Sequence, residues 1–246
     1  SRAENGKLTD AGNSMSPDIE RVMSLNPDAI LLSPFENAGY GRIGKMGIPI
    51  IECADYLETS PLGRAEWIKF FGLLYGKEVE ADSIFTEVEK NYTELRDKIG
   101  VLSSAPVVIS ELKSGSAWYM PGGKSYMARF FKDAGAAYPW SDNTETGSIP
   151  LSFETVFNRA GKADIWLIKS FHVSELSYRT LQKEYAPYAR FKAFREKKIY
   201  GCDSSRCNYY EETPFRPDLL LQELAALFHP GLFPDYRFRY YQPLSE

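Results

Sequence analysis

Short apolar runs alternate with amphipathic segments along most of the chain. The runs are compact and rich in Ile, Val and Leu, like strands buried in parallel sheets, and they lie at 29–33, 48–53, 106–110, 164–168 and 198–201. Between them, apolar residues recur at helical spacing, which predicts helices over 16–25, 61–76, 77–102, 124–134, 151–160, 174–185 and 216–229. Alternating strands and helices indicate an α/β fold.

The segment 77–102 is the longest predicted helix. Its apolar residues recur at alternating spacings of three and four and so form one stripe: Ala81, Phe85, Val88, Tyr92, Leu95 and Ile99. A helix of this length between two α/β segments is typical of a strut. We therefore predict two α/β lobes with mainly parallel sheets, at 1–76 and 103–246, joined by this one long linking helix.

The composition excludes some classes of partner. A net charge of -4 and a pI near 5.5 provide no basic surface for nucleic acid or for an anionic membrane. No apolar run is long enough to predict a transmembrane helix. The chain is rich in aromatic residues, with 16 Tyr and 15 Phe. Some belong to the core, but those in predicted loops suggest a surface that grips something large and partly apolar.

Two motifs imitate nucleotide-binding loops but lack the necessary context. Gly123-Lys124-Ser125 resembles the end of a phosphate-binding loop, yet Trp118 occupies the position where that loop needs its first glycine. The glycine pattern at 39–44 fits a dinucleotide fingerprint, but the next predicted strand follows after four residues and leaves no room for the crossover helix. We predict neither a nucleotide site nor a dinucleotide site.

The sequence shows no recognisable set of catalytic residues. The chain has two histidines, His172 and His229, and no G-x-S-x-G motif for a hydrolase serine. Two imidazoles also make a transition-metal site hard to build. We predict a protein that is not an enzyme and has no resident cofactor and no metal site. The alternative is an α/β enzyme that uses carboxylates such as Asp203 or Glu211 as general acid or base.

The cysteines leave two interpretations open. Cys202 and Cys207 are close enough in sequence to form a disulfide in an oxidising compartment. Two buried free thiols are the alternative.

Four segments together resemble the substrate-binding proteins of bacterial ABC importers for iron-siderophore complexes, haem and cobalamin. They are SPDIERVMSLNPDAILLS, PGGKSYMARFFKDAGA, IPLSFETVFNRAGKADIWLI and RPDLLLQELAALFHPGLFPD. The resemblance covers nearly the whole chain in order. It implies two lobes joined by a rigid helix, a ligand held in the cleft between lobes, and delivery to an ABC permease by a monomeric periplasmic protein. A sensor or surface lipoprotein on the same scaffold is a further alternative.

The resemblance also assigns a role to two glutamates. Glu20 and Glu154 match the exposed carboxylates with which each lobe of such proteins docks onto an arginine pocket of the permease. Both lie in the first turn of a predicted helix, where the helix dipole favours the ionised form. The alternative is that each is only a favourable acidic residue at a helix start.

Ligand residues are expected in loops that follow the strands, because ligands of open α/β sheets bind there. This rule nominates Ser33, Pro34, Phe35, Trp118, Tyr119, Phe171, His172, Asp203, Ser204, Arg206, Tyr209 and Tyr210. We expect Trp118 and Tyr119 to form an aromatic wall for a bulky chelate, or else to cap the core of the second lobe. Arg206 could pair with an anionic ferric chelate or remain solvated. Tyr209 or His172 could ligate haem iron.

The N-terminal region departs from the family pattern. Members normally carry further strand and helix units before the segment SPDIE, whereas only about fifteen polar residues precede it here. We expect the first lobe to be incomplete, and a signal peptide and any lipid-anchoring cysteine to have been removed with the missing part. The ligand is predicted to be an iron-siderophore complex or a related metal chelate, with haem or cobalamin as alternatives.

Overall fold

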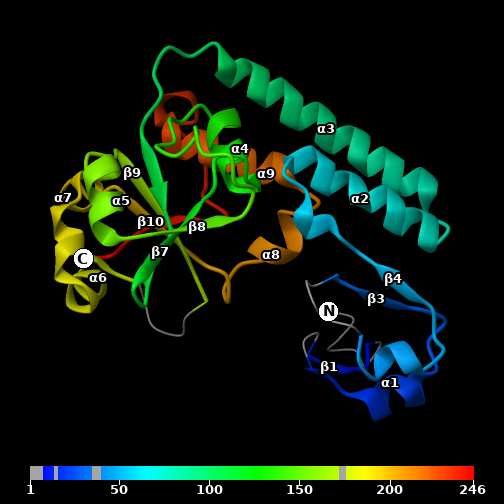
Figure 1. Cartoon of the computed structure of the whole chain (residues 1–246). Coiled ribbons are helices and arrows are strands. Elements are labelled where there is room, and N and C mark those ends of the chain that lie inside the picture. Colours follow the sequence, from blue (N-terminus) through cyan, green and yellow to red (C-terminus); the bar gives the residue numbers. More distant parts are fainter. Residues whose placement is uncertain (1–7, 14–15, 35–39, 172–175) are drawn as a thin grey trace. The chain divides into compact units, whose positions relative to one another are not determined.

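The computed structural model describes residues 8–13, 16–34, 40–171 and 176–246, and the chain divides into two compact units, Ser1–Leu57 and Glu58–Glu246 (Figure 1). The predicted α/β class is confirmed in both, since each contains helices and parallel strands. The predicted boundary after residue 76 differs from this division, because the helices over 61–100 group with the second unit.

The first unit contains a short parallel sheet and one α-helix. Strand β3 pairs with β4 in parallel, with Ile30 opposite Ile50. Its elements are β1 (Gly12–Asn13), β2 (Ser16–Pro17), α1 (Ile19–Leu25), β3 (Ile30–Leu32), η1 (Ile43–Lys45), β4 (Ile50–Glu52) and η2 (Asp55–Leu57). The helix predicted from residue 16 begins later, because Asp18 caps it: its carboxylate accepts a hydrogen bond from the Arg21 backbone N–H at 3.1 Å.

The second unit is built on a four-stranded sheet in the order β11-β10-β9-β5. Its strands are β5 (Val108–Ser110), β9 (Ile165–Ser170), β10 (Ile199–Asp203) and β11 (Gln242–Pro243), of which only β11 runs antiparallel. A second, antiparallel sheet consists of β6 (Lys113–Ser114), β7 (Ala117–Pro121) and β8 (Ser148–Leu151). This antiparallel sheet was not predicted from the sequence.

Helices cover the sheets of the second unit. Figure 1 shows α5, α6 and α7 on one side and α4 and α9 on the other. The helices are α2 (Pro61–Leu74), α3 (Glu78–Gly100), α4 (Tyr126–Asp133), α5 (Phe153–Ala160), α6 (Tyr178–Glu184), η3 (Ala186–Arg190), α7 (Lys192–Arg195), α8 (Tyr209–Glu212), α9 (Pro217–Phe228) and η4 (Pro230–Leu232). Serine side chains cap the start of α2, α4, α5 and α6 by accepting backbone N–H bonds.

Helix α3 lies close to the bounds predicted for the linking helix. Its apolar stripe is buried at Ala81, Phe85, Val88, Tyr92 and Ile99, and it packs against α2, α4 and α9. The Tyr92 hydroxyl also donates to the Asp133 carboxylate at 2.8 Å. These contacts make α3 part of the second unit, while its role as a spacer between lobes stays a prediction.

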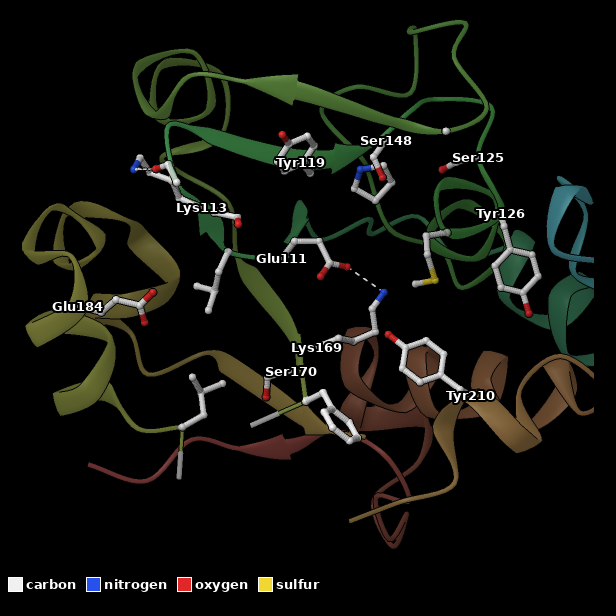
Figure 2. A pocket seen from close by; sticks show the side chains of 18 of the residues that line it. Glu111, Lys113, Tyr119, Ser125, Tyr126, Ser148, Lys169, Ser170, Glu184 and Tyr210 are labelled. Atoms are coloured by element: carbon white, nitrogen blue, oxygen red, sulfur yellow. Dashed lines mark hydrogen bonds and ion pairs between the residues drawn. The ribbon is translucent and has the colours of Figure 1, made fainter. Parts of the chain in front are cut away.

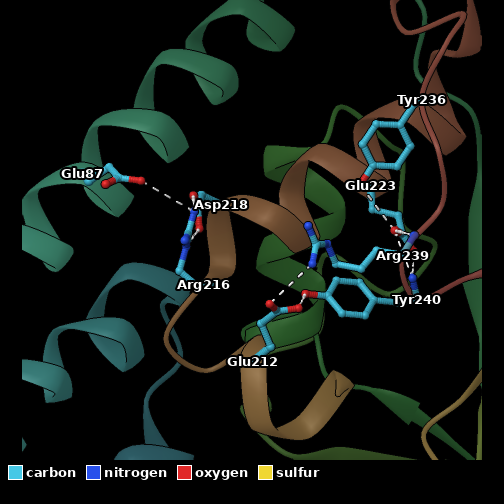
Figure 3. A network of polar contacts seen from close by, with 8 residues as sticks. All are labelled: Glu87, Glu212, Arg216, Asp218, Glu223, Tyr236, Arg239 and Tyr240. Atoms are coloured by element: carbon cyan, nitrogen blue, oxygen red, sulfur yellow. Dashed lines mark hydrogen bonds and ion pairs between the residues drawn. The ribbon is translucent and has the colours of Figure 1, made fainter. Parts of the chain in front are cut away.

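A buried carboxylate fastens the C-terminal segment to helix α9. Glu223 is 0% exposed and accepts hydrogen bonds from the backbone N–H groups of Arg239 and Tyr240 at 2.5 and 2.8 Å (Figure 3). It also accepts one from the Tyr241 N–H at 2.5 Å. Nearby, Glu212 accepts the Tyr240 hydroxyl at 2.6 Å. A buried backbone N–H needs a hydrogen-bond acceptor. At these three residues the Glu223 carboxylate supplies the acceptor that a neighbouring strand would supply in a sheet.

Replacing Glu223 with Ala is expected to lower the free energy of unfolding by about 3 kcal/mol, because three buried N–H donors lose their acceptor. Gln222→Ala is the matched control, since this exposed residue precedes Glu223 on the same helix and should change the stability by less than about 0.5 kcal/mol. Urea denaturation followed by circular dichroism measures both. Equal urea midpoints for the two variants would contradict the anchoring role.

Candidate functional site

A pocket of about 970 Å³ opens in the second unit beside the carboxyl ends of β5 and β9 (Figure 2). Most of its lining comes from the β5–β6 segment, strand β7, the start of α4 and the segment after β9. The lining residues are Glu111, Leu112, Lys113, Ser114, Gly115, Tyr119, Pro121, Ser125, Tyr126, Met127, Thr146, Gly147, Ser148, Lys169, Ser170, Phe171, Leu176, Thr180, Glu184 and Tyr210. Parallel sheets bind ligands at this edge, so its position fits a binding site.

An ion pair stands in the middle of the pocket in Figure 2. The Lys169 ammonium lies 2.8 Å from the Glu111 carboxylate, and the two side chains are 16% and 25% exposed. The Lys169 ammonium also lies 5.7 Å from the centre of the Tyr209 ring. Burial works against the charge on Lys169, but the attraction of Glu111 outweighs it and raises the pKa of the ammonium above its ordinary value. Lys169 is therefore a cation at any physiological pH.

The backbone holds Glu111 in an unusual conformation. Its φ of 64° lies in the left-handed region, which costs a residue with a side chain about 1 kcal/mol or more. The Glu111 N–H donates to the Leu167 carbonyl, and its carbonyl accepts from the Trp166 indole, both at 2.9 Å. These two bonds fix the turn that directs the carboxylate to Lys169. Backbone strain of this kind concentrates at functional sites.

Three aromatic side chains form the exposed rim of the pocket. Tyr119, Phe171 and Tyr210 are 49%, 76% and 61% exposed, and all three line the pocket. Within the described part of the chain, the hydroxyls of Tyr119 and Tyr210 have no protein hydrogen-bond partner. Exposed rings and free phenolic hydroxyls can hold a bulky ligand by both stacking and hydrogen bonds.

The expectation that Trp118 belongs to this wall is wrong. Its side chain is 0% exposed, and its indole N–H donates to the Ser110 carbonyl at 3.0 Å. The ring packs on Trp166, Tyr188 and Phe191. Residues 117–121 are a strand rather than a loop, and successive side chains of a strand point to opposite faces. Trp118 thus caps the core, as the alternative held, while Tyr119 faces the pocket.

The rule that ligand residues follow the strands also assigned Tyr209 to the binding site, where the structure does not place it. It is only 4% exposed, and its hydroxyl lies 3.7 Å from the Met127 sulfur. Burial raises the pKa of Tyr209 to about 12. Tyr209 is not among the residues that line the pocket, so its phenol is not placed to ligate haem iron there. Its neighbour Tyr210 points outward and lines the pocket instead.

The remaining nominated residues are scattered. Asp203 and Arg206 form an ion pair at 3.3 Å beside a separate pocket of about 330 Å³. The Ser204 hydroxyl donates to the Ser170 carbonyl at 3.1 Å. Ser33 and Pro34 belong to the first unit and are half-buried, while Phe35 and His172 lie outside the described residues.

The ion pair and the serine residues of the pocket were missed in the sequence. The strand predicted over 164–168 continues to Ser170, two residues further. Glu111 directly follows the strand predicted over 106–110, and Lys169 directly follows the one predicted over 164–168, so the rule that ligands meet the ends of strands already covered both positions. Ser125 and Ser148 carried no signal, because serine is equally common at helix caps and in turns.

The described cysteines and possible metal ligands were also located. Cys202 and Cys207 are free thiols whose sulfur atoms lie 3.7 Å apart, and their pairing stays a prediction. Burial raises the pKa of Cys202, so it is a thiol rather than a thiolate near neutral pH. Within residues 8–13, 16–34, 40–171 and 176–246, no group of three or more His, Cys, Asp or Glu side chains is placed to hold a metal ion.

The glutamates nominated for docking are both exposed. Glu20 lies in the first turn of α1 and Glu154 in the first turn of α5. Neither takes part in an ion pair or side-chain hydrogen bond with the described residues. Both carboxylates are therefore accessible to a partner.

Comparison with known proteins identifies the family. Residues 1–205 match the family model described as periplasmic binding protein, so the chain belongs to that family, as its sequence indicated. An uncharacterized lipoprotein of Methanocaldococcus jannaschii is 31% identical over 239 residues, which are 93% of this chain and 54% of that protein. The chain thus spans about half the length of this relative.

Solved structures share the fold. A periplasmic heme binding protein from Pseudomonas aeruginosa has a TM-score of 0.71 and 18% identity, covering 92% of this chain and 80% of that one. An ABC transporter substrate-binding protein from Listeria monocytogenes has a TM-score of 0.68 and 15% identity, covering 93% and 86%. Among the described residues, none of the helices combines the length and apolar character needed to cross a membrane.

Proposed function

We propose that this chain captures an iron-siderophore complex or a related metal chelate outside the cytoplasmic membrane and delivers it to an ABC permease. The observation that carries this proposal is the open pocket with an aromatic rim at the carboxyl ends of β5 and β9. Its volume suits a ligand larger than a simple ion or a single amino acid. Membership of a family of solute-binding proteins supports the same function.

The same comparisons support a proposal for the cellular location. The family is one of periplasmic proteins, and the relative from Methanocaldococcus jannaschii is named a lipoprotein. We propose a protein on the outer side of the cytoplasmic membrane, held there by a lipid anchor. Glu20 and Glu154 supply the carboxylates that dock onto arginine pockets of the permease, because both are exposed at helix starts.

Haem is the second candidate ligand. One relative with the same fold is named a heme binding protein. The phenolic hydroxyls of Tyr119 and Tyr210 face the pocket without a protein partner among the described residues, and a phenolate can serve as an axial ligand of haem iron. Absorption spectra with added haemin distinguish such ligation from simple stacking.

Ligand binding should quench tryptophan fluorescence and raise the melting temperature by mass action. Tyr119→Ala and Tyr210→Ala should each weaken chelate binding by about tenfold, because each removes an aromatic contact at the rim. Tyr75→Ala is the control, since this residue is 70% exposed at the end of α2 and does not line the pocket. Titrations with a ferric trihydroxamate, a ferric tricatecholate, haemin and a cobalamin measure the affinities.

Two outcomes of these titrations contradict the proposal. If none of the four ligands binds, capture of a chelate is wrong. If a bound ligand is recovered chemically altered after incubation, the alternative of an enzyme with carboxylates such as Asp203 or Glu211 gains support, because a binding protein returns its ligand unchanged.

A further inference from the structure

The charges that line the pocket balance one another. Among the described lining residues, the charged ones are two anions and two cations: Glu111, Glu184, Lys113 and Lys169. The rest of the described lining is neutral, and much of it carries hydroxyl groups. A site for a polyanionic ligand normally carries an excess of Arg and Lys, and these residues provide none.

The two lysines are also engaged by the protein. Lys113 donates to the Gly115 carbonyl and lies 5.3 Å from the centre of the Tyr185 ring. The Lys169 side chain is 16% exposed and is neutralised by Glu111 at 2.8 Å. A ligand anion could use the full charge of Lys169 only by displacing the Glu111 carboxylate. That displacement would leave a partly buried anion without its partner, which is costly.

Resting on the function proposed above, we propose that the Glu111–Lys169 pair makes this pocket selective for metal chelates without net charge, such as neutral ferric trihydroxamates. Glu111 is the selectivity-determining residue, because it cancels the cation that an anionic chelate would need. The hydroxyls of Tyr119, Tyr210 and Ser148 offer hydrogen bonds to the amide and hydroxamate oxygens of such a ligand. Stacking on the rim aromatics adds contact that does not depend on charge.

The pair also predicts how selectivity changes when either partner is removed. Glu111→Gln preserves the size of the side chain but leaves the Lys169 cation uncompensated, which favours anionic chelates. Lys169→Met leaves the Glu111 anion uncompensated, which favours cationic chelates. A general loss of folding would weaken the binding of every ligand to a similar extent. Opposite changes of charge preference in the two variants therefore cannot be explained by misfolding. The double variant restores a neutral pocket.

The test measures dissociation constants of the full chain for three probes by fluorescence quenching: ferrioxamine B, which is cationic, ferrichrome, which is neutral, and ferric enterobactin, which is trianionic. The unmodified chain should bind ferrichrome at least about tenfold more tightly than ferric enterobactin. Glu111→Gln should shift that ratio at least about tenfold toward the anion, and Lys169→Met should shift the ferrichrome to ferrioxamine B ratio similarly toward the cation. The double variant should return both ratios to within about threefold of the original.

Glu78→Gln is the matched control, because it makes the same charge change at an exposed position of α3 that does not line the pocket and should shift the ratios by less than about threefold. The inference is overturned if the unmodified chain prefers the trianion, or if Glu111→Gln shifts the ratios no more than Glu78→Gln. It is also overturned if both single variants shift the binding preference toward ligands of the same sign of charge. Failure of the unmodified chain to bind any probe, haemin or a cobalamin overturns the proposed function itself, and this inference with it.

Discussion

Trp118→Ala is expected to destabilise the second unit by about 4 kcal/mol, the largest effect of any single substitution considered for this fold. The side chain is 0% exposed and packs against Trp166, Tyr188 and Phe191. Its removal opens a cavity among rigid rings that cannot easily close. It also deprives the Ser110 carbonyl of its indole donor, which adds the cost of a buried acceptor without a partner.

The adjacent residue is the natural control for this prediction. Tyr119 lies one position further along the same strand, is 49% exposed and faces the pocket. Tyr119→Ala should change the stability by less than about 1 kcal/mol while weakening ligand binding. Urea denaturation should be followed by far-ultraviolet circular dichroism, since the substitution alters fluorescence directly. Similar losses of stability in both variants would mean that Trp118 and Tyr119 do not point to opposite faces of β7.

Reversing the charge of both docking glutamates is expected to abolish most transport without changing ligand affinity. In the variant with Glu20→Lys and Glu154→Lys, uptake of a radiolabelled ferric chelate in the native host should fall at least about tenfold, because each lysine would face an arginine pocket of the permease. Affinity measured on the purified protein should stay within about twofold, because neither glutamate lines the pocket.

The control for docking is Glu78→Lys, which reverses an exposed acid in the first turn of α3. It makes the same kind of change at the same kind of helix position, so it tests whether any surface charge reversal impairs uptake. Uptake should remain near the original level. If Glu78→Lys impairs uptake as strongly as the double variant, or if the double variant transports normally, the docking role of Glu20 and Glu154 is excluded.

The order of helices and strands was largely readable from the sequence. Helices α2, α3, α4, α5 and α9 lie within a few residues of their predicted bounds, because each has an apolar stripe, and a serine also caps the start of α2, α4 and α5. The parallel strands were visible as short runs of Ile, Val and Leu. The antiparallel sheet of β6, β7 and β8 was not predicted. Its strands contain or adjoin Pro and Gly residues, and their apolar and polar residues alternate only weakly.

Only the tertiary structure decided which side chains line the pocket. The sequence by itself determined the family and the α/β class, because periodicity and segment order are local properties. It could not determine which of Trp118 and Tyr119 faces the pocket, since that depends on which face of β7 packs on the Trp166 ring. It also could not bring Glu111 to Lys169, because residues 58 positions apart meet only when β5 pairs with β9 in register.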